Sequence, residues 1–317
     1  MLDITTIILT YNEEIHIRRC LENVCRFSKK VIVVDSPSTD RTAEIVSEAS
    51  ESQKASGGAD IEFVVHKYPG NQAEQFNWAL DNCKIETEWI LRLDADEYLT
   101  PELIEELEEK LPKLPKDVTG VELKRRHIFM EKWVKHGIYP VIILRLFRTG
   151  KGRYASRLMD EHISLSDGHS MVMENDFCDH SLITISDYCR KHIGYAEREA
   201  TEALDEEYGL REHNLGLRDE SLTLGQQAHD KQHKKSTYYR LSVLARSCAY
   251  FIYRYILRGG FLDGKAGFAF AFIQGWWYRT MVDLNILQAK RHCGDNKAKL
   301  IDYIQRNWGI KITQDQK

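Results

Sequence analysis

The chain has 317 residues, of which 43% are hydrophobic and 29% charged, with only 6 prolines. This length suggests about two domains, or one large domain with an appendage, and the apolar content can form a sizeable core. The composition excludes a collagen-like, proline-rich or disordered chain. No apolar run reaches the roughly 18–20 residues of a membrane span; the longest candidate, residues 266–278, contains Gln274.

The N-terminal residues lack the basic leader of a signal peptide. The seven cysteines are scattered and form no Cys-x-x-Cys pair. Both observations favour a cytoplasmic protein whose thiols stay reduced.

Charge is distributed unevenly along the chain. Residues 231–317 carry 16 Lys and Arg against 5 Asp and Glu, a net charge of +11, whereas residues 1–230 carry a net charge of −15. The basic region is also aromatic, and its aromatic residues lie in apolar runs. This pattern favours an anionic membrane surface over nucleic acid as the partner. The alternative is an ordinary helical region with a basic face, which packs on the rest of the chain or on a second copy.

The first 115 residues alternate between strand and helix patterns. The sequence predicts strands at 4–10, 30–35, 61–66 and 89–94, helices at 13–27, 42–49, 71–83 and 102–111, and a polar loop at 51–60. Continuous apolar strands that alternate with helices indicate an α/β fold with a mainly parallel sheet covered on both faces. Ligands bind such sheets at the carboxyl ends of the strands. Polar residues gather there: Thr10, Tyr11, Asn12, Glu13, Asp35, Ser36, His66, Lys67, Asp94 and Asp96.

After Pro115 the pattern changes. Residues 120–126 and 141–147 are predicted to be antiparallel strands around a basic and aromatic insert. A loop at 160–162 precedes another strand, and residues 186–208 have the spacing of a long helix. In the tail, residues 250–257 and 266–278 are predicted to be two short helices that lie flat on a membrane surface, joined by a turn at Gly259 and Gly260. Arg254, Arg258, Lys265 and Arg279 are expected to face anionic headgroups, and Trp276 and Trp277 to lie at headgroup depth.

The acidic run Asp94-Ala95-Asp96-Glu97 follows an apolar strand. Two carboxylates one residue apart at a strand end can bind one cation. Oxygen ligands suit Mg²⁺ or Mn²⁺, which bind through one or two carboxylates together with substrate phosphates. The alternative is a solvated acidic turn in which Asp96 or Glu97 caps a helix. Asp35, at the end of another strand, favours the metal site.

Two nucleotide-binding motifs are absent from the sequence. No Gly-x-Gly-x-x-Gly follows the first strand, where Thr10 to Glu14 stand instead, so a dinucleotide-dependent dehydrogenase is disfavoured. No Gly-x-x-x-x-Gly-Lys-Ser/Thr occurs either, which excludes a P-loop.

Seven segments carry a family resemblance. They are ILTYNEE (8–14), VVDSPSTDRT (33–42), QFNWAL (75–80), WILRLDADEYLTPEL (89–103), RLMDEHISL (157–165), DHSLITISDYCRKHIGYAEREA (179–200) and YILRGGFLDGKAGFAFAF (255–272). The first four, in this order and spacing, resemble the family 2 inverting glycosyltransferases of the GT-A fold. The last three resemble a bacterial branch of that family, the lipopolysaccharide-core β-1,4-glucosyltransferase-like enzymes. The chain departs from the pattern at Pro37, where the family usually has Gly, and at Ile193, where the branch often has Asn.

The resemblance implies transfer of a sugar, with inversion, from a nucleotide-sugar donor to a glycan or lipid-linked acceptor in lipopolysaccharide or cell-surface polysaccharide synthesis. A UDP-sugar is the favoured donor. Site residues carried over from the family fall into three groups. They are Thr10, Tyr11, Glu13, Asp35 and Asp94 for the donor; Asp94, Asp96 and His180, with His162 as second choice to His180, for the metal; and Glu161, with Asp160 as runner-up, for the base.

The same resemblance implies three parts. Residues 1–115 form the nucleotide-sugar-binding half of a GT-A domain, residues 116–210 form the acceptor-side half, and residues 211–317 form a helical region that associates with a membrane or with another copy. Two other functions compete with this assignment. A metal-dependent nucleotidyltransferase is expected to have a Gly-rich, basic loop after its first strand, and a non-catalytic membrane scaffold does not require this set of carboxylates.

Overall fold

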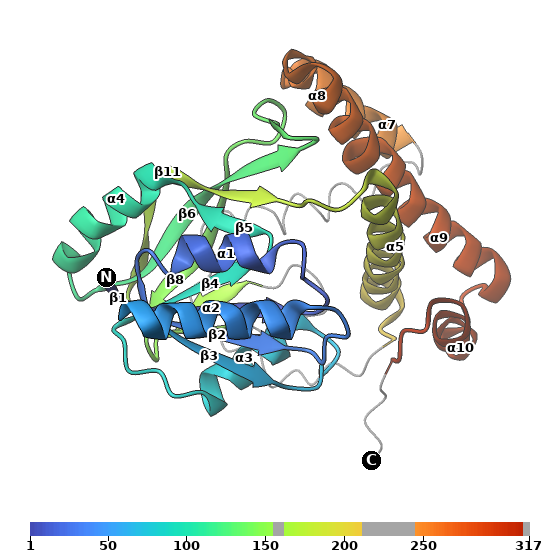
Figure 1. Ribbon diagram of the computed structural model, residues 1–317. Helices are drawn as coiled ribbons and strands as arrows, with labels where there is room; N and C mark the ends of the chain where they lie inside the picture. The colour runs from blue at the N-terminus through green and yellow to red at the C-terminus, as the bar shows by residue number, and fades with distance from the viewer. Residues whose placement is uncertain (155–161, 211–244, 313–317) are drawn as a thin grey trace. The chain divides into compact units, whose positions relative to one another are not determined.

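A computed structural model describes residues 1–154, 162–210 and 245–312. The chain divides into two compact units, whose elements are labelled in Figure 1. The described part of the first unit is residues 1–135, 139–154 and 162–182, and that of the second is 136–138, 183–210 and 245–312. Among the described helices, none is both long and apolar enough to cross a bilayer.

The first unit is built on one mixed sheet with the strand order β3-β2-β1-β4-β8-β6-β11-β5. Its strands are β1 (Leu2–Thr10), β2 (Ser28–Asp35), β3 (Asp60–Val65), β4 (Trp89–Asp94), β5 (Glu97–Leu99), β6 (Val118–Phe129), β8 (Val141–Arg148) and β11 (His169–His180). Strands β1 to β4 are mutually parallel. Strand β8 runs antiparallel between β4 and β6, β11 is parallel to β6, and β5 is antiparallel to β11. Strand β7 (Lys132–Trp133) extends β6, and β9 (Gly152–Tyr154) pairs with β10 (Ile163–Leu165).

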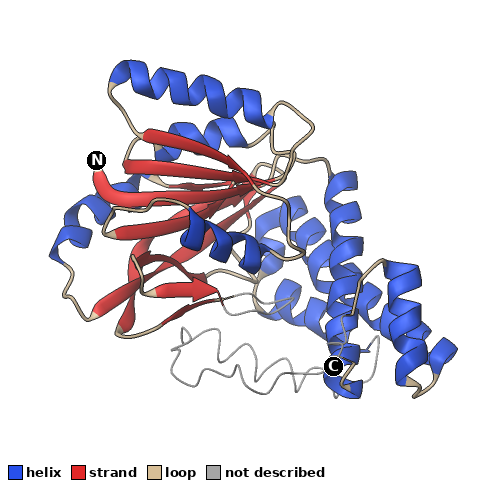
Figure 2. Cartoon of the chain, turned by 90° about the horizontal axis from the view of Figure 1, so that it is seen from below, coloured by secondary structure: helices blue, strands red, loops and turns tan. Residues whose placement is uncertain are grey.

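Helices cover both faces of this sheet (Figure 2). One face packs against α1 (Ile17–Val24), α2 (Thr42–Ser56) and α4 (Pro101–Lys110). The other packs against α3 (Gln72–Asn82) and the β9–β10 strand pair. The turn η1 (Leu111–Lys113) follows α4. Neighbouring residues of β1 point to opposite faces, since Ile8 belongs to the first core and Ile7 to the second. The predicted α/β architecture is therefore confirmed.

Helix α2 differs from the prediction. It continues to Ser56, whereas the sequence predicted a loop from residue 51. Residues 51–56 include good helix formers, so their polarity marks a solvated face and not a loop. Helix α2 ends at Gly57, which adopts the left-handed conformation with φ 67° that glycine tolerates best.

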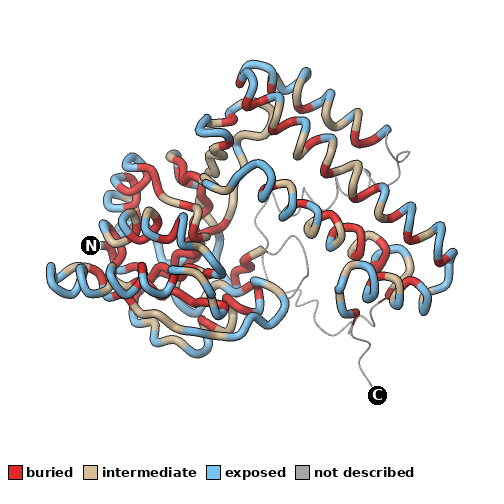
Figure 3. Tube along the Cα trace, turned by 45° about the vertical axis from the view of Figure 1, so that its right-hand side comes forward, coloured by how far each residue is buried: buried red, intermediate tan, exposed pale blue. Residues whose placement is uncertain are grey.

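The second unit is helical. Its elements are α5 (Ile185–Tyr208), α7 (Ala245–Ile252), the π-helical turn η3 (Tyr253–Leu257), the 3₁₀ turn η4 (Gly260–Asp263), α8 (Gly264–Phe270), the π-helical segment η5 (Ala271–Trp277), α9 (Tyr278–Cys293) and α10 (Lys297–Trp308). Buried residues recur along α5 and α9 (Figure 3), where Ala196, Ala200 and Leu204 share a core with Val282 and Ile286.

Two expectations for this region change. The helix predicted at 266–278 is part of a continuous helical run from Gly264 to Cys293. The structure also groups α5 with the C-terminal helices, whereas the sequence division assigned it to the acceptor-side half. The functional division at residues 115 and 210 stays a prediction.

Candidate active site

The structure brings Thr10 and Asp35 together at the carboxyl edge of the sheet. Parallel pairing of β1 with β2 sets these residues side by side. The Thr10 hydroxyl donates to Asp35 Oδ1 over 2.8 Å, and Ser38 donates its hydroxyl to Oδ1 (2.6 Å) and its backbone N–H to Oδ2 (2.8 Å). Asp35 is only 2% exposed. Its carboxylate is therefore fixed before any ligand arrives.

The loop after β1 is closed by polar contacts with the β2–α2 loop. Asn12, at φ 55°, donates its backbone N–H to the Ser38 hydroxyl and accepts the Thr39 N–H. The Glu13 carboxylate contacts His16 Nδ1 at 2.6 Å, while His16 Nε2 accepts the Leu182 N–H, so the proton of a neutral His16 lies on Nδ1. Tyr11 is 62% exposed. Of the predicted donor residues in this loop, Tyr11 is open to solvent and Glu13 already has an internal partner.

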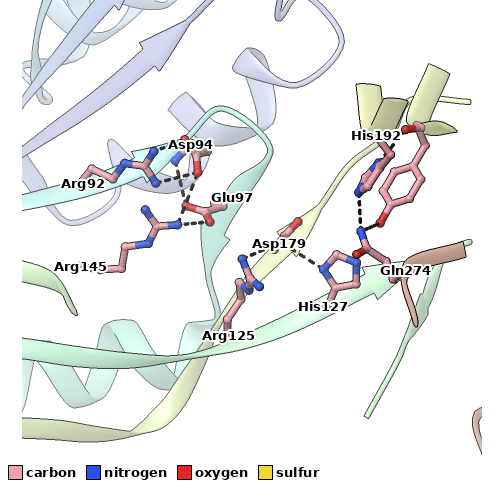
Figure 4. A network of polar contacts seen from close by, with 10 residues as sticks. Arg92, Asp94, Glu97, Arg125, His127, Arg145, Asp179, His192 and Gln274 are labelled. Carbon is pink, nitrogen blue, oxygen red and sulfur yellow. Dashed lines mark hydrogen bonds and ion pairs between the residues drawn. The ribbon is translucent and has the colours of Figure 1, made fainter. Parts of the chain in front are cut away.

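Asp94 is held by two arginines (Figure 4). Arg92 grips it with both terminal nitrogens, at 2.8 and 2.7 Å, which is the two-pronged geometry that arginine offers a carboxylate. Arg145 contacts Asp94 at 3.5 Å and Glu97 at 2.5 Å. The Glu97 carboxylate in turn accepts the backbone N–H of Asp94. Arginines thus hold both the Asp94 and the Glu97 carboxylates of the acidic turn.

Glu97 is buried, with 2% of its surface exposed. Burial, together with the nearby charge of Asp94, raises the pKa of Glu97 well above its ordinary value. From the sequence, Glu97 is expected only as a possible helix cap. Neither it nor Arg145 was predicted as part of the site, although an arginine inside an apolar strand such as β8 signals a buried charged partner.

Asp96 and His180 lie beside each other at one end of the β5–β11 strand pair. Pairing of β5 with β11 continues into a hydrogen bond of 3.0 Å from the His180 backbone N–H to the Asp96 carbonyl. Arg19 of α1 donates to both backbone carbonyls, at 3.2 Å for Asp96 and 2.5 Å for His180. Arg19 is a second positioning residue that the sequence did not reveal.

The His180 ring has two polar neighbours. Arg19 lies 3.0 Å from Nδ1, and Glu131 lies 3.1 Å from Nε2. Because a guanidinium can only donate, Nδ1 accepts and Nε2 of the neutral ring carries the proton. Ligation of a metal by Nε2 requires that this proton leave and that the contact with Arg19 change.

His162, the second choice for the metal, is described and half-buried. Glu161 and Asp160 lie outside the described residues, so the predicted base stays a prediction. Within the described ranges, no three His, Cys, Asp or Glu side chains converge closely enough to hold a metal ion as they stand. Asp96 and His180 offer the carboxylate and imidazole donors that Mn²⁺ or Mg²⁺ accept, with substrate phosphates as further ligands.

A mixed sheet with helices on both faces and carboxylates at the ends of its parallel strands is an architecture found among nucleotide-binding α/β proteins. The family model described as Glycosyl transferase family 2 matches residues 5–179, more than half of the chain. The chain belongs to this family.

Curated relatives agree with this assignment. The lipopolysaccharide core biosynthesis glycosyltransferase LpsC of Rhizobium meliloti (strain 1021) is 31% identical over 153 residues, which cover 48% of this chain and 53% of LpsC. An uncharacterized glycosyltransferase of Rickettsia bellii (strain RML369-C) is 39% identical over 105 residues, covering 33% of this chain and 31% of that protein. The chain therefore spans about half or less of the length of these relatives.

Among solved structures, the mannosyltransferase PcManGT of Pyrobaculum calidifontis, in complex with GDP-Man and Mn²⁺, has a TM-score of 0.50 and 15% identity. The match covers 91% of this chain and 88% of that one. This likeness concerns the fold, and it confirms the GT-A architecture that the resemblance implied.

Proposed function

We propose that the protein transfers a sugar from a nucleotide-sugar donor to a glycan or lipid-linked saccharide acceptor, with a divalent cation and with inversion at the sugar. The observation that carries this proposal is the convergence of two groups at the carboxyl edge of the β1–β4 strands. One is the fixed Thr10–Asp35 pair, and the other is the Asp94–Asp96 turn, with His180 beside Asp96.

In this proposal the donor's nucleoside binds near Asp35. Its Oδ2 accepts the Ser38 N–H and, as a carboxylate oxygen with two lone pairs, can accept one further hydrogen bond from an imide or hydroxyl group. The exposed ring of Tyr11 is free to stack on the base. A UDP-sugar, whose base carries an imide N–H, remains the favoured donor.

Asp96 is the proposed principal metal ligand. Asp94 is already gripped by Arg92, so we assign it to the ribose and to orientation of the turn. His180 becomes a ligand only when Arg19 releases Nδ1. A bound Mg²⁺ or Mn²⁺ supplies Lewis-acid stabilisation of the charge that develops on the leaving diphosphate. The Mn²⁺ and GDP-Man present with the Pyrobaculum protein, whose fold this chain shares, support this proposal.

The proposed base is Glu161, with Asp160 as the alternative. It removes the proton of the acceptor hydroxyl on the face opposite the leaving group, as inversion requires. The name of LpsC supports an acceptor of the lipopolysaccharide-core type.

We also propose that the protein associates peripherally with an anionic membrane surface, at the inner face of the cytoplasmic membrane. The second unit exposes a set of large apolar side chains on α7, η3, η4, α8 and η5, here called the apolar ridge: Ile252, Tyr253, Ile256, Leu257, Phe261, Leu262, Phe268, Phe272 and Trp276. Two cations on the same segment, Arg258 and Lys265, are exposed and match anionic headgroups.

The detailed placement predicted from sequence needs correction. Arg254 was expected to face headgroups but is buried, at 7% exposure. Arg279 was expected to do the same but pairs with Glu199 at 2.5 Å. Trp277 packs against the helical core, whereas Trp276 is exposed. An α-helix repeats every 3.6 residues, so a long helical run that packs on a core buries some residues of each aromatic cluster. The prediction of two short helices on a surface did not include this burial.

Donor hydrolysis tests the catalytic proposal. Purified protein is incubated with UDP-, GDP- and dTDP-sugars, with and without Mn²⁺, and the released nucleotide is identified. We expect a nucleoside diphosphate from one donor class, dependent on the metal. A parallel incubation contains a nucleoside triphosphate and a sugar phosphate. Release of pyrophosphate there would indicate a nucleotidyltransferase. No turnover with any of these substrates would favour a scaffold.

Liposome flotation tests the membrane proposal separately. Binding is expected to require anionic lipid, to weaken with salt and to fall when Ile256 and Leu257 are replaced by serine. The matched control replaces Leu284 and Leu287, exposed leucines on α9 outside the apolar ridge. Equal loss in both variants, or salt-independent binding, would contradict the proposal. A concentration-dependent dimer that the ridge substitutions abolish would assign this surface to a second copy instead.

A further inference from the structure

Arg254 is a buried cation in the second unit. It lies on the π-helical turn η3 and keeps 7% of its surface exposed. Its guanidinium lies over the rings of Phe270 and Tyr250, at 5.2 and 5.5 Å from the ring centroids. Its Nε atom is buried and makes no hydrogen bond. Aromatic faces stabilise such a cation in part, but they do not neutralise it.

Other buried or half-buried arginines of this unit have carboxylate partners. Arg246 pairs with Asp283, with one contact of 2.8 Å from Nε, and Arg279 pairs with Glu199. Arg254 has no such partner among the described residues. Burial lowers the pKa of Arg254, and the neighbouring charge of Arg279 contributes in the same direction, whereas a hydrogen bond with Tyr250 opposes them. A buried guanidinium without a carboxylate partner costs solvation free energy, which favours a role in binding an anion.

The surroundings of Arg254 indicate the kind of ligand. The same π-helical turn exposes Tyr253, Ile256 and Leu257, by 45%, 54% and 73%. π-Helical turns often occur at functional sites, because the extra residue per turn redirects side chains. A guanidinium binds phosphate oxygens with two parallel hydrogen bonds. A guanidinium beside an exposed apolar surface suits an amphiphile with a phosphate head and an apolar tail.

We propose that Arg254 binds the phosphate of a membrane-lipid headgroup, while the apolar ridge contacts the acyl chain. The site rests on the proposed membrane association, and it does not depend on the donor, the metal or the base. It also differs from general attraction to anionic surfaces, because one buried residue carries it.

The test measures binding of soluble short-chain lipids to the full chain by isothermal titration. Dihexanoylphosphatidic acid below its critical micelle concentration is the lipid probe, and inorganic phosphate is the free-anion probe. We expect the lipid to bind at least tenfold more tightly than phosphate. Arg254→Met should weaken lipid binding at least tenfold, whereas Arg291→Gln, which removes an exposed cation of α9 outside the apolar ridge, should change it less than twofold.

The melting temperature of Arg254 variants distinguishes a role of this residue in binding from a role in stabilising the fold. Without ligand, Arg254→Met should melt at the same temperature as the wild type or higher, because the substitution removes a buried charge that has no carboxylate partner. Should Met disturb packing, Arg254→Lys keeps the charge but loses the two-pronged contact, and its lipid affinity should still fall. Wild-type lipid affinity in both variants would overturn the proposal. Equal affinity for phosphate and lipid would overturn the lipid assignment.

Discussion

At the scale of single residues, carboxylates of the first unit are fixed by particular donors. Asp35 is held by Thr10 and Ser38, and Asp94 is held by Arg92. A site organised in this way does not have to reorient its charged groups when substrate binds, which is the basis of electrostatic preorganisation. The sequence could place these carboxylates at strand ends. It did not reveal Arg19, which donates to the Asp96 backbone carbonyl, or Arg145, which pairs with Glu97, because each lies far from its partner along the chain.

Arg145→Met should destabilise the protein by about 3–5 kcal/mol, because it leaves Glu97 buried without its cation. Adding Glu97→Gln should recover part of that loss. Urea unfolding followed by circular dichroism measures both variants. Arg153→Met is the control: its pair with Asp81 is half exposed on both sides, so about 1 kcal/mol or less is expected. Equal losses in the Arg145 and Arg153 variants would contradict this account.

The lowered pKa of Asp40 predicts that the free energy of unfolding depends on pH. Its partial burial tends to raise the pKa of its carboxyl, but hydrogen bonds from Thr42 and from the Glu14 N–H outweigh burial and hold the pKa below its ordinary value. A depressed folded-state pKa gives stability that is present above the unfolded value of about 3.9 and is lost as the pH falls through the folded one. Asp40→Asn should therefore cost more stability at pH 6 than at pH 3. A difference independent of pH would refute this reasoning.

Glu161→Gln should leave donor binding nearly unchanged and lower turnover by roughly 10²–10⁴, the usual contribution of a general base. Fluorescence titration with the nucleoside diphosphate and steady-state transfer rates measure the two effects. Asp160→Asn is the paired variant. If it is inactive while Glu161→Gln turns over normally, the two residues exchange roles.

At the scale of elements, apolar periodicity identified strands β1 to β4 and helices α1 to α4, because each one buries an apolar face. Strands β5 and β11 were not predicted. Strand β5 has only three residues. In β11, buried and exposed residues alternate irregularly, and its partner strand β6 lies more than 40 residues earlier in the sequence. These two strands position Asp96 beside His180, so the geometry of the proposed metal site depends on strand pairings that local pattern does not encode.

Helix α3 should depend on its N-cap. The Asn71 side chain accepts the Glu74 backbone N–H at 2.7 Å and so satisfies one of the free donors of the first turn. Asn71→Ala should lower the free energy of unfolding by about 1 kcal/mol. Asn71→Ser, which keeps an acceptor without placing a second carboxylate beside Glu74, should be nearly neutral in the same urea experiment. Indistinguishable Ala and Ser variants would show that the cap contributes nothing.

At the scale of the whole molecule, charge segregation predicted two regions with different surroundings. The helical unit does carry the apolar ridge, but sequence alone overestimated which cations are exposed. Arg254 and Arg279 illustrate the limit: a basic residue in an apolar run can lie on a surface or be buried against aromatic rings and carboxylates, and only the tertiary packing decides.

The central claim is that the acidic turn after β4 supports metal-dependent sugar transfer, and Asp96→Ala tests it most directly. Nucleoside diphosphate release from the active donor is measured across a Mn²⁺ titration, with circular dichroism as a check on folding and Glu131→Ala as the matched control, since Glu131 is an exposed acid that also neighbours His180. We predict a folded Asp96→Ala protein whose metal-dependent turnover is lost, beside a control that retains most activity. Wild-type turnover of Asp96→Ala at low Mn²⁺ would contradict the claim.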